Sequence, residues 1–320
     1  MDWIIDALIA FILLSILTNG VLFVYHRIQM SRERRDLKPR GKFVDVKGLR
    51  MNVFCANEVM CSNKPTIVLL SGSGVGAPIF DYKILYSQLT SLASVVVLEK
   101  FGYGYADISH LPKDIKTLVD DNREALRRAR VFPPYILMPH SMSALEAIYW
   151  TSKFPTEIIG IIGLDMAVPE RYHNYQKRLK KIRFFHLMTA IGWQRIPQIF
   201  PINNKGLSSE EKRQNAILSY KNALNTDVFR ESMTVCENAL IVETMGTPNV
   251  PMLMFTTTLN KGNGYEAWID AQTRFAQKSQ QCRQIILDCG HNLHYDKTPE
   301  MVTEIKKFIM VFSTDIENNI

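Results

Sequence analysis

A short polar turn at Ser141 interrupts an apolar run and is followed at once by a helical pattern. The apolar run covers residues 135–138, and the helical pattern begins at Ser143. A serine in a sharp strand-to-helix turn has its hydroxyl pushed out of the sheet, while the new helix directs backbone N–H groups at the same point. The spacing is similar to GxSxG, with Pro139 and Ser143 in place of the glycines. The pattern therefore indicates a nucleophilic serine, with an ordinary buried strand-turn-helix junction as the alternative.

A glycine-rich loop follows an earlier apolar run at residues 66–70. It reads SGSGVG from Ser71 to Gly76. Glycines at alternate positions let the backbone bend close to a ligand and direct N–H groups at a developing negative charge. A phosphate-binding loop would end in GKS or GKT, or would open as GxGxxG directly into a helix, and this loop does neither. The loop is predicted to form an oxyanion site, with a plain turn as the alternative.

Two histidines follow the last predicted strand, at residues 284–287. His291 lies on a loop just past the carboxyl end of that strand, where open α/β sheets place their ligands. From there an imidazole can reach a serine at a neighbouring strand end and serve as its general base. His294 is expected to be structural.

The elements that must hold these residues alternate between strand and helix. Residues 42–46 and 50–55 flank a Lys-Gly turn and predict an antiparallel hairpin. Continuous apolar runs, typical of strands buried on both faces of a parallel sheet, then alternate with helical patterns. The predicted strands are 66–70, 94–98, 135–138, 158–164, 252–255 and 284–287, and the predicted helices are 82–92, 115–130, 143–154, 265–278 and 299–312. This alternation predicts a doubly wound α/β sheet.

The alternation breaks after Pro169. Residues 171–242 are helical in pattern, basic at first and rich in aromatics, and are best explained as an inserted helical cap. The predicted divisions are an anchor at 1–26, a basic linker at 27–41, a core at 42–169 and 244–320, and a cap at 170–243.

Five segments in this order resemble the α/β-hydrolase family, and the resemblance covers residues 42–312. It implies an eight-stranded, mostly parallel sheet with the cap inserted after the sixth strand. It also implies Ser141 as nucleophile, His291 as base, and an oxyanion hole from the backbone N–H groups of Ser73 and Met142. Epoxide and haloalkane hydrolysis are disfavoured, because those members of the family carry a carboxylate where Ser141 stands. The segments are LLSGSG (69–74), EKFGYGY (99–105), PHSMSA (139–144), GLDMAVP (163–169) and CGHNLHYDKTPE (289–300).

The acid of the implied triad has two candidate positions. Family members usually carry it just after the strand at 252–255, but the matching loop has Asn260 at that place and no carboxylate before Glu266. Some family lipases take the acid from the end of the preceding strand, and Asp165 resembles that arrangement. Either position can supply a carboxylate that orients the imidazole. Asp165 is the favoured acid, with Glu266, or no acid and a structural capping role for Asp165, as alternatives.

An uncharged apolar stretch at residues 7–25 is long enough to cross about 30 Å of hydrocarbon as a helix. A secretory signal would begin with a positive residue and end in a small-x-small cleavage site, whereas Asp2 and Asp6 precede this stretch and Tyr25-His26-Arg27 ends it. Residues 27–42 are rich in Lys and Arg, and positive charge next to a span stays on the cytoplasmic side. The sequence predicts a single-pass membrane protein with a cytoplasmic globular domain; a buried helix docked on the domain is the alternative.

The composition excludes several other classes of protein. A chain of 320 residues with 47% hydrophobic residues can bury a large core. Its 5 cysteines form no close CxxC pair, which argues against a disulfide framework and a structural zinc site. The net charge of +7 is concentrated in residues 27–42 and 170–200, and neither segment contains a nucleic-acid-binding motif. No metal, cofactor or nucleic-acid partner is therefore predicted.

The start of the cap has the pattern of a basic amphipathic helix at residues 171–183. Such a helix beside a membrane span can lie against anionic headgroups, or it can pack its apolar stripe on the core and solvate its charges. The apolar set is Tyr172, Tyr175, Leu179 and Ile182, and the basic set is Lys177, Arg178, Lys180, Lys181 and Arg183.

Together these features predict a membrane-anchored serine hydrolase that cleaves an acyl lipid or another hydrophobic ester through an acyl-enzyme. An aminopeptidase or amidase would use the same triad and would also need an acidic site for the amino terminus of its substrate. A non-catalytic sensor or binding module with the same fold is the third hypothesis, motivated by the altered turn around Ser141 and the absence of a carboxylate at Asn260.

Overall fold

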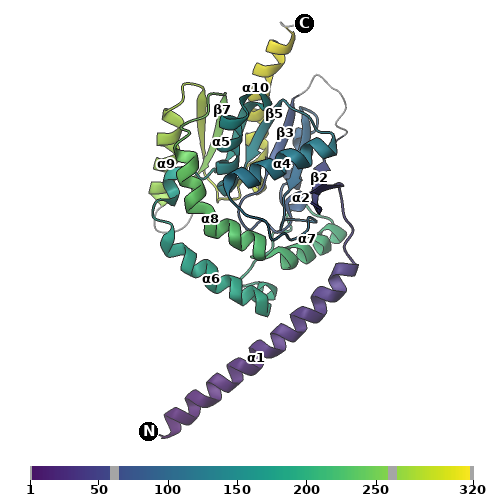
Figure 1. The fold of residues 1–320 in the computed structure, drawn as a ribbon, viewed down its shortest axis with the longest axis vertical. Helices are drawn as coiled ribbons and strands as arrows, with labels where there is room; N and C mark the ends of the chain where they lie inside the picture. The colour runs from purple at the N-terminus through teal and green to yellow at the C-terminus, as the bar shows by residue number, and fades with distance from the viewer. Residues whose placement is uncertain (1, 58–64, 259–264, 318–320) are drawn as a thin grey trace.

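The computed structural model describes residues 2–57, 65–258 and 265–317 as an eight-stranded sheet with helices on both faces and a long helix projecting from it (Figure 1). The strand order is β1-β2-β4-β3-β5-β6-β7-β8. The pairs β1–β2 and β2–β4 are antiparallel, and the others are parallel. The strands are β1 (Lys42–Val46), β2 (Leu49–Cys55), β3 (Thr66–Leu70), β4 (Ser94–Glu99), β5 (Tyr135–Pro139), β6 (Ile158–Leu164), β7 (Met252–Thr257) and β8 (Cys282–Leu287).

Each predicted strand is confirmed within one or two residues at either end. The central strands β3, β4 and β5 are buried at every residue, which is why their sequences are continuous apolar runs with no alternation. The described helices are α1 (Asp2–Arg35), α2 (Pro78–Asp81), α3 (Lys83–Leu89), α4 (Ile115–Ala129), α5 (Ala144–Lys153), α6 (Gln176–Ile191), α7 (Ser209–Asn222), α8 (Thr226–Glu243), α9 (Tyr265–Gln277) and α10 (Thr298–Glu317).

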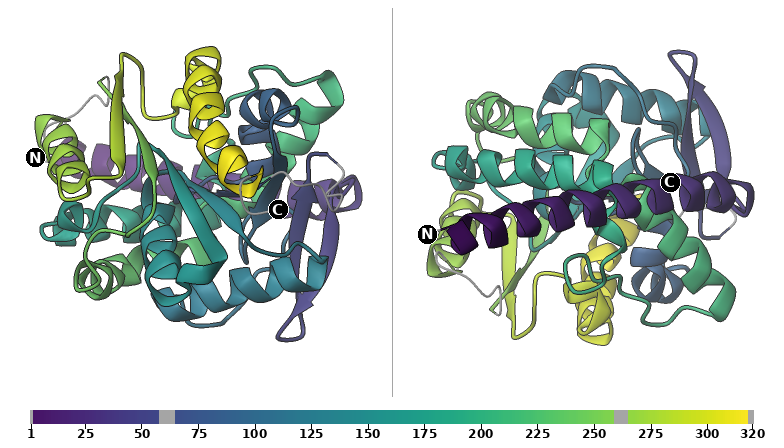
Figure 2. Two further views of the ribbon diagram at one scale, coloured as in Figure 1. Left: turned by 90° about the horizontal axis from the view of Figure 1, so that it is seen from above. Right: turned by 90° about the horizontal axis from the view of Figure 1, so that it is seen from below.

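The helices pack on the sheet in two layers. Helices α4, α5 and α9 lie on one face, and α3 and α10 lie on the other (Figures 1 and 2). On the first face the fully buried Trp150 of α5 packs in the same cluster as β5. On the second, Ile305 of α10 and Leu85 of α3 belong to a separate cluster. The sheet is thus covered on both sides, as the doubly wound prediction requires.

The segment between β6 and β7 forms the helices that cover the carboxyl end of the sheet. It begins with a 3₁₀ turn, η3 (Pro169–Tyr172), and continues through α6, a second turn η4 (Trp193–Arg195), α7 and α8. The start differs from the single helix predicted for residues 171–183, because the chain turns first to bury Tyr172 and enters α6 only at Gln176. These helices lie between the sheet and α1 in Figure 1.

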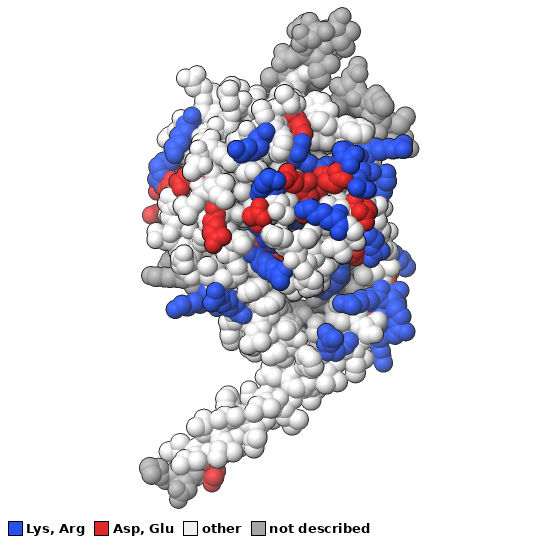
Figure 3. Space-filling view, in the orientation of Figure 1, with Lys and Arg blue, Asp and Glu red and all other residues white. Residues whose placement is uncertain are grey.

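Helix α1 contains the whole stretch predicted to span a membrane. It is the one helix among the described residues that is long and apolar enough to cross a membrane, over Trp3–Arg35. Its first half projects from the domain with large apolar side chains exposed, including Phe11 and Leu13. Figure 3 shows this projecting part without Lys or Arg, whereas blue side chains gather on the globular part near its base.

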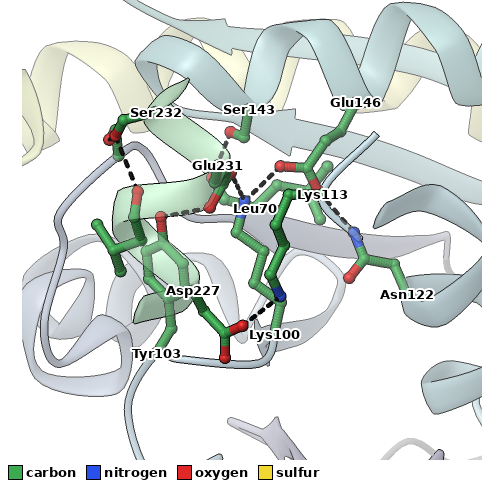
Figure 4. A network of polar contacts seen from close by, with 12 residues as sticks. Leu70, Lys100, Tyr103, Lys113, Asn122, Ser143, Glu146, Asp227, Glu231 and Ser232 are labelled. Carbon is green, nitrogen blue, oxygen red and sulfur yellow. Dashed lines mark hydrogen bonds and ion pairs between the residues drawn. The ribbon is translucent and has the colours of Figure 1, made fainter. Parts of the chain in front are cut away.

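A buried network of charges joins the cap to the core (Figure 4). Lys100, just after β4, contacts the carboxylates of Glu146 on α5 and Glu231 on α8. Tyr103 donates its hydroxyl to Glu231 at 2.8 Å. Burial alone would lower the pKa of Lys100, but the two carboxylates raise it above its ordinary value. The network fixes α8 against the core. Ser232, the residue after Glu231, lies with its hydroxyl 3.3 Å from the hydroxyl of Ser73.

Candidate active site

Ser141 lies at the turn between β5 and α5, in a strained backbone conformation. Its φ is +54°, in the left-handed region that residues other than glycine rarely adopt. The 3₁₀ turn η1 (Ser141–Ser143) leads directly into α5. The carbonyl of Ser141 accepts a hydrogen bond from the Ala167 N–H at 2.9 Å, which helps to hold the turn. A strained turn of this kind is the geometry that exposes a nucleophilic hydroxyl at the top of a sheet.

The two departures from GxSxG are accommodated by hydrogen bonds of the turn. Pro139 ends β5 opposite Leu70, and the next residue, His140, donates its N–H to the Leu70 carbonyl at 3.1 Å. The Ser143 hydroxyl accepts the His140 N–H at 3.0 Å and lies 2.9 Å from the carbonyl oxygens of Leu70 and His140, to which it can donate. The hydroxyl that replaces a glycine is thus used within the turn and leaves the Ser141 side chain unobstructed.

The glycine-rich loop after β3 lies against this turn. A Cβ atom on Gly72 would lie 2.8 Å from His140 Nδ1 and 3.1 Å from Ser141 Cβ, so only glycine permits the approach. Ser73, the next residue, lines the same pocket as Ser141. Met142 stands in the first turn of a helix, where a backbone N–H has no partner within the helix. The two amides predicted to form an oxyanion hole therefore belong to segments that meet at Ser141.

His291 and Asp165 form a close pair. His291 Nδ1 lies 2.6 Å from Asp165 Oδ2. The carboxylate is buried, whereas the imidazole is partly exposed. His291 and Ser141 line one pocket, so the pair lies beside the candidate nucleophile. Asp165 follows β6 directly, with a φ of +42°, which is a second strained position at this edge of the sheet.

Three further residues direct donors at Asp165. Thr257, at the end of β7, donates from its backbone N–H at 3.1 Å and from its hydroxyl at 2.8 Å. Trp268 and Gln272 on α9 donate at 2.9 and 3.0 Å. Burial alone would raise the pKa of Asp165, but the His291 imidazole and these donors hold it below its ordinary value. None of the three could be predicted from the sequence, since only the packing of α9 and the end of β7 brings them to this carboxylate.

The other candidate acid is not the one bonded to the imidazole. Glu266 is exposed on the first turn of α9, and among the described residues the carboxylate bonded to His291 is that of Asp165. Asn260, the residue at the family's usual acid position, lies outside the described residues.

A second histidine–carboxylate pair lies next to the first. His294 Nε2 is 2.9 Å from Asp81 Oδ2, and the Tyr295 hydroxyl donates to the same carboxylate. His294 is fully buried, in agreement with the structural role expected for it. His140 packs between the two pairs, with its ring centroid 4.8 Å from that of His291. Burial and the neighbouring imidazoles lower the pKa of His140 to about 3, so this side chain is neutral.

The pocket at Ser141 has a volume of about 400 Å³. Core residues form one wall, and cap residues between Gln194 and Leu224 form the other, so the cap closes over the site. Apolar side chains such as Ile199 and Phe200 alternate with amides. Asp81 supplies the acidic side chain among the lining residues, and it is already held by His294 and Tyr295.

In the described part of the chain, no group of three or more His, Cys, Asp or Glu side chains is placed to hold a metal ion. Cys55, Cys236, Cys282 and Cys289 are free thiols.

Comparison with known proteins gives one sequence relative of substantial coverage and many structural neighbours. No protein-family model matches the chain. The chain is 38% identical to the Bacillus subtilis (strain 168) protein described as "Uncharacterized protein YbdG" over 236 residues, which cover 70% of each chain. A putative lipase from Acinetobacter baumannii AYE matches with a TM-score of 0.67 at 15% identity, over 92% of this chain and 97% of the lipase. A loop variant of the haloalkane dehalogenase DbeA from Bradyrhizobium elkanii matches with a TM-score of 0.66 at 14% identity, over 87% of this chain and 99% of the dehalogenase.

At such low identities the structural neighbours establish the fold and nothing finer. The strand order, the two helical layers and the helices inserted between β6 and β7 are those of the α/β-hydrolase fold, and the predicted fold class is confirmed.

Proposed function

The chain belongs to the same protein family as the uncharacterized Bacillus subtilis protein YbdG, and we propose that it is a membrane-anchored serine hydrolase that cleaves a carboxylic ester through an acyl-enzyme. The observation that carries this proposal is the strained turn at Ser141, which lines one pocket with His291 while that imidazole is bonded to the buried Asp165. A serine hydroxyl, an imidazole and a carboxylate form the catalytic triad of a serine hydrolase.

In the first half of the reaction, Ser141 Oγ attacks the ester carbonyl carbon while His291 takes the hydroxyl proton. The carbonyl oxygen gains negative charge, which the backbone N–H groups of Ser73 and Met142 stabilise. The carbon–oxygen bond to the alcohol then breaks, His291 returns the proton to the leaving alkoxide, and the acyl group stays on Ser141. In the second half, water loses a proton to His291 as it attacks the acyl carbon. The bond from that carbon to Ser141 Oγ then breaks, His291 returns the proton to Ser141, and the carboxylic acid is released.

Asp165 has a supporting role in this scheme. It accepts a hydrogen bond from His291 Nδ1, which leaves Nε2 free to act as the base, and it stabilises the imidazolium that forms. The donors from Thr257, Trp268 and Gln272 keep the carboxylate ionised and fix its orientation.

The pocket supports a hydrophobic ester over a peptide with a free amino terminus. Such a peptide needs an unpaired carboxylate for its ammonium group, and the lining carboxylate, Asp81, is already bonded to His294 and Tyr295. The apolar Ile199 and Phe200 suit an acyl chain. Displacement of a halide from carbon, the reaction named for the dehalogenase neighbours, is not proposed, because a serine stands at the nucleophile position.

Helix α1 is proposed as the membrane anchor, with the globular domain on the cytoplasmic side. Its apolar first half is exposed, and its charged second half begins at Arg27. The end of the helix is bonded to the cap, since Arg195 donates to both carboxylate oxygens of Glu33 at 2.8 and 2.6 Å. These contacts support a helix that stays with the folded domain and is not removed as a signal sequence.

The decisive experiment is labelling of the full-length, detergent-solubilised protein with a fluorophosphonate probe. We expect one adduct on Ser141, strongly reduced in His291→Ala and absent in Ser141→Ala. An ester panel of increasing acyl length then defines the substrate. A folded protein that neither reacts with the probe nor hydrolyses any ester would overturn the proposal and favour a binding module with this fold.

A further inference from the structure

The cap exposes an apolar surface on the side from which α1 projects. Phe184 and Leu187 on α6 are 51% and 59% exposed, and Ile199, just after η4, is 38% exposed. Lys180 precedes Phe184 by four residues and Arg183 precedes Leu187 by four, so each basic side chain shares a face of α6 with an exposed apolar one. We define the docking face as Lys180, Lys181, Arg183, Phe184, Leu187 and Ile199.

Contacts between α1 and the cap show which part of α1 the docking face lies beside. Trp193 donates its indole N–H to Asn19 Oδ1 at 2.9 Å, and Asn19 belongs to the apolar half of α1. The ring of Phe184 packs edge-on against Trp193, with centroids 6.1 Å apart. Asn19 precedes Arg27, the first basic residue of α1, by eight positions, or about 12 Å along a helix. The docking face therefore lies beside the cytoplasmic end of the stretch of α1 proposed to span the membrane.

The same junction is closely packed and well bonded. A Cβ atom on Gly192, at the end of α6, would lie 2.7 Å from His26 Cβ and 3.3 Å from the Leu22 carbonyl, so the two backbones are close. Arg195 is nearly buried between His26 and Glu33. Helix α1 contacts both α6 and α7, and it crosses beneath the cap in Figure 2. The angle between α1 and the docking face is thus fixed by contacts with the folded cap.

A groove lies between the docking face and the pocket at Ser141. It has a volume of about 550 Å³ and lies between α6 and the segment after η4. Phe185 lines the groove, and its ring lies 5.9 Å from that of Phe200. Ile199, Phe200 and Leu224 line both the groove and the pocket, so the two are adjacent and share these side chains. Arg178 and Lys181 stand among the residues that line the groove.

From these relationships we propose that the docking face lies in the headgroup region of the membrane that α1 spans, with its basic side chains on anionic lipid, so that substrate enters the pocket from the bilayer. This inference rests on the membrane anchor of the proposed function. Apolar side chains of an interfacial helix sit at the boundary between headgroups and acyl chains, and Trp is enriched at that level. Lysine and arginine next to them attract anionic lipid.

Photo-crosslinking in vesicles tests the proposal with the full-length chain. We would introduce p-benzoylphenylalanine at Leu187, at Leu13 in α1, or at Phe132, which is 60% exposed before β5 at the opposite end of the sheet. The vesicles contain phosphatidylcholine alone or with phosphatidylglycerol, and lipid adducts are counted by mass spectrometry. We expect adducts at Leu13 and Leu187, few at Phe132, and several-fold more at Leu187 when phosphatidylglycerol is present.

The three positions separate failure of the anchor from failure of the docking face. Adducts at Leu13 without adducts at Leu187 would overturn the docking face and leave the anchor intact. Absence of adducts at both positions would contradict both. Replacing Lys180, Lys181 and Arg183 by Gln should remove the dependence on phosphatidylglycerol, and a dependence that survives would contradict the role given to these charges.

Hydrolysis provides an independent measurement. Leu187→Asp should lower turnover of a membrane-embedded ester several-fold and leave turnover of a short water-soluble ester unchanged, while Phe132→Asp should change neither. Equal loss on both substrates would show damage to the site and count against the docking face.

Discussion

His291 Nδ1 lies 2.6 Å from Asp165 Oδ2, although 126 positions separate the two residues in the chain. The aspartate comes from the end of β6, and the neighbouring strand β7 ends in Thr257, which donates two hydrogen bonds to that carboxylate. The acid and its hydroxyl donor thus stand on adjacent strand ends. This arrangement gives the imidazole a buried, ionised partner without a carboxylate at the end of β7.

Asp165→Asn should lower ester turnover by about 10³- to 10⁴-fold, because an amide can hold His291 in the wrong tautomer and cannot stabilise the imidazolium. Turnover and circular dichroism of the full-length protein check this. Glu266→Gln is the matched control and should retain turnover, since Glu266 is exposed on α9. If Asp165→Asn were as active as the parent protein, the pair would have a structural role only.

Gly72→Ala should abolish labelling of Ser141 by a fluorophosphonate while the protein remains folded. The added methyl group would lie 2.8 Å from His140 Nδ1 and 3.1 Å from the His140 carbonyl and Ser141 Cβ, so the loop that carries Ser73 must move away from the turn. Gly290→Ala is the control, because its Cβ atom would meet nothing within 4 Å. Normal labelling of Gly72→Ala would show that this close approach is not needed for the reaction.

The fold was predictable because parallel strands buried on both faces must be continuously apolar. β3 and β6 have the same bounds in the prediction and in the structure. The helix expected over residues 82–92 is present as the shorter α3, and it is preceded by the short helix α2, which begins at Pro78 and was not predicted. The entry into the cap differed because burial of Tyr172 in a 3₁₀ turn depends on tertiary contacts that periodicity does not reveal.

One rule of the prediction is that side chains just past the carboxyl ends of parallel strands meet at one edge of a sheet. That rule pointed to His291, whereas the turn pattern pointed to Ser141 and the family resemblance to Asp165. It could not identify Trp268 or Gln272, since the helical pattern of α9 does not reveal which face meets Asp165. Nor could it show that the hydroxyl of Ser143, which stands where the motif has a glycine, accepts a hydrogen bond from the His140 N–H within the turn.

Ser143→Ala should lower the free energy of unfolding by about 0.5 to 1.5 kcal/mol, because the hydrogen bonds of its hydroxyl are lost while the His140 N–H keeps the Leu70 carbonyl as acceptor. Chemical denaturation in detergent measures this loss. Ser87→Ala serves as the control, because its hydroxyl is exposed and donates only within its own helix. Equal stability of the two variants would mean that the Ser143 hydrogen bonds contribute nothing net.

Lys100→Met should destabilise the protein by about 3 to 5 kcal/mol, since it leaves the carboxylates of Glu146 and Glu231 buried without their cation. Adding Glu231→Gln should recover part of the loss. Lys116→Met is the control: it breaks an exposed pair with Asp120, and exposed pairs contribute little to stability. Denaturant titration of the parent protein, Lys100→Met, the double variant and Lys116→Met measures these losses. A loss of unfolding free energy in Lys100→Met no larger than that in Lys116→Met would contradict a stabilising network.

Glu99 should make stability fall as the pH rises from about 4.5 to about 7. Burial raises the pKa of this carboxyl from 4.5 to about 7, despite hydrogen bonds from Asn52 and the Tyr105 N–H. Between those pH values the folded state binds a proton that the unfolded state has lost, so the contribution of Glu99 to the free energy of unfolding decreases with pH, by about 3 kcal/mol in all.

Glu99→Gln removes this titration, so the difference in unfolding free energy between the parent protein and this variant should change across the window and level off above pH 7. Denaturation curves recorded at successive pH values measure the difference. Glu300→Gln, at an exposed position on α10, should give a difference that stays nearly constant with pH. A constant difference for Glu99→Gln as well would mean that Glu99 titrates alike in the folded and unfolded states, and that its hydrogen bonds offset the cost of burial in full.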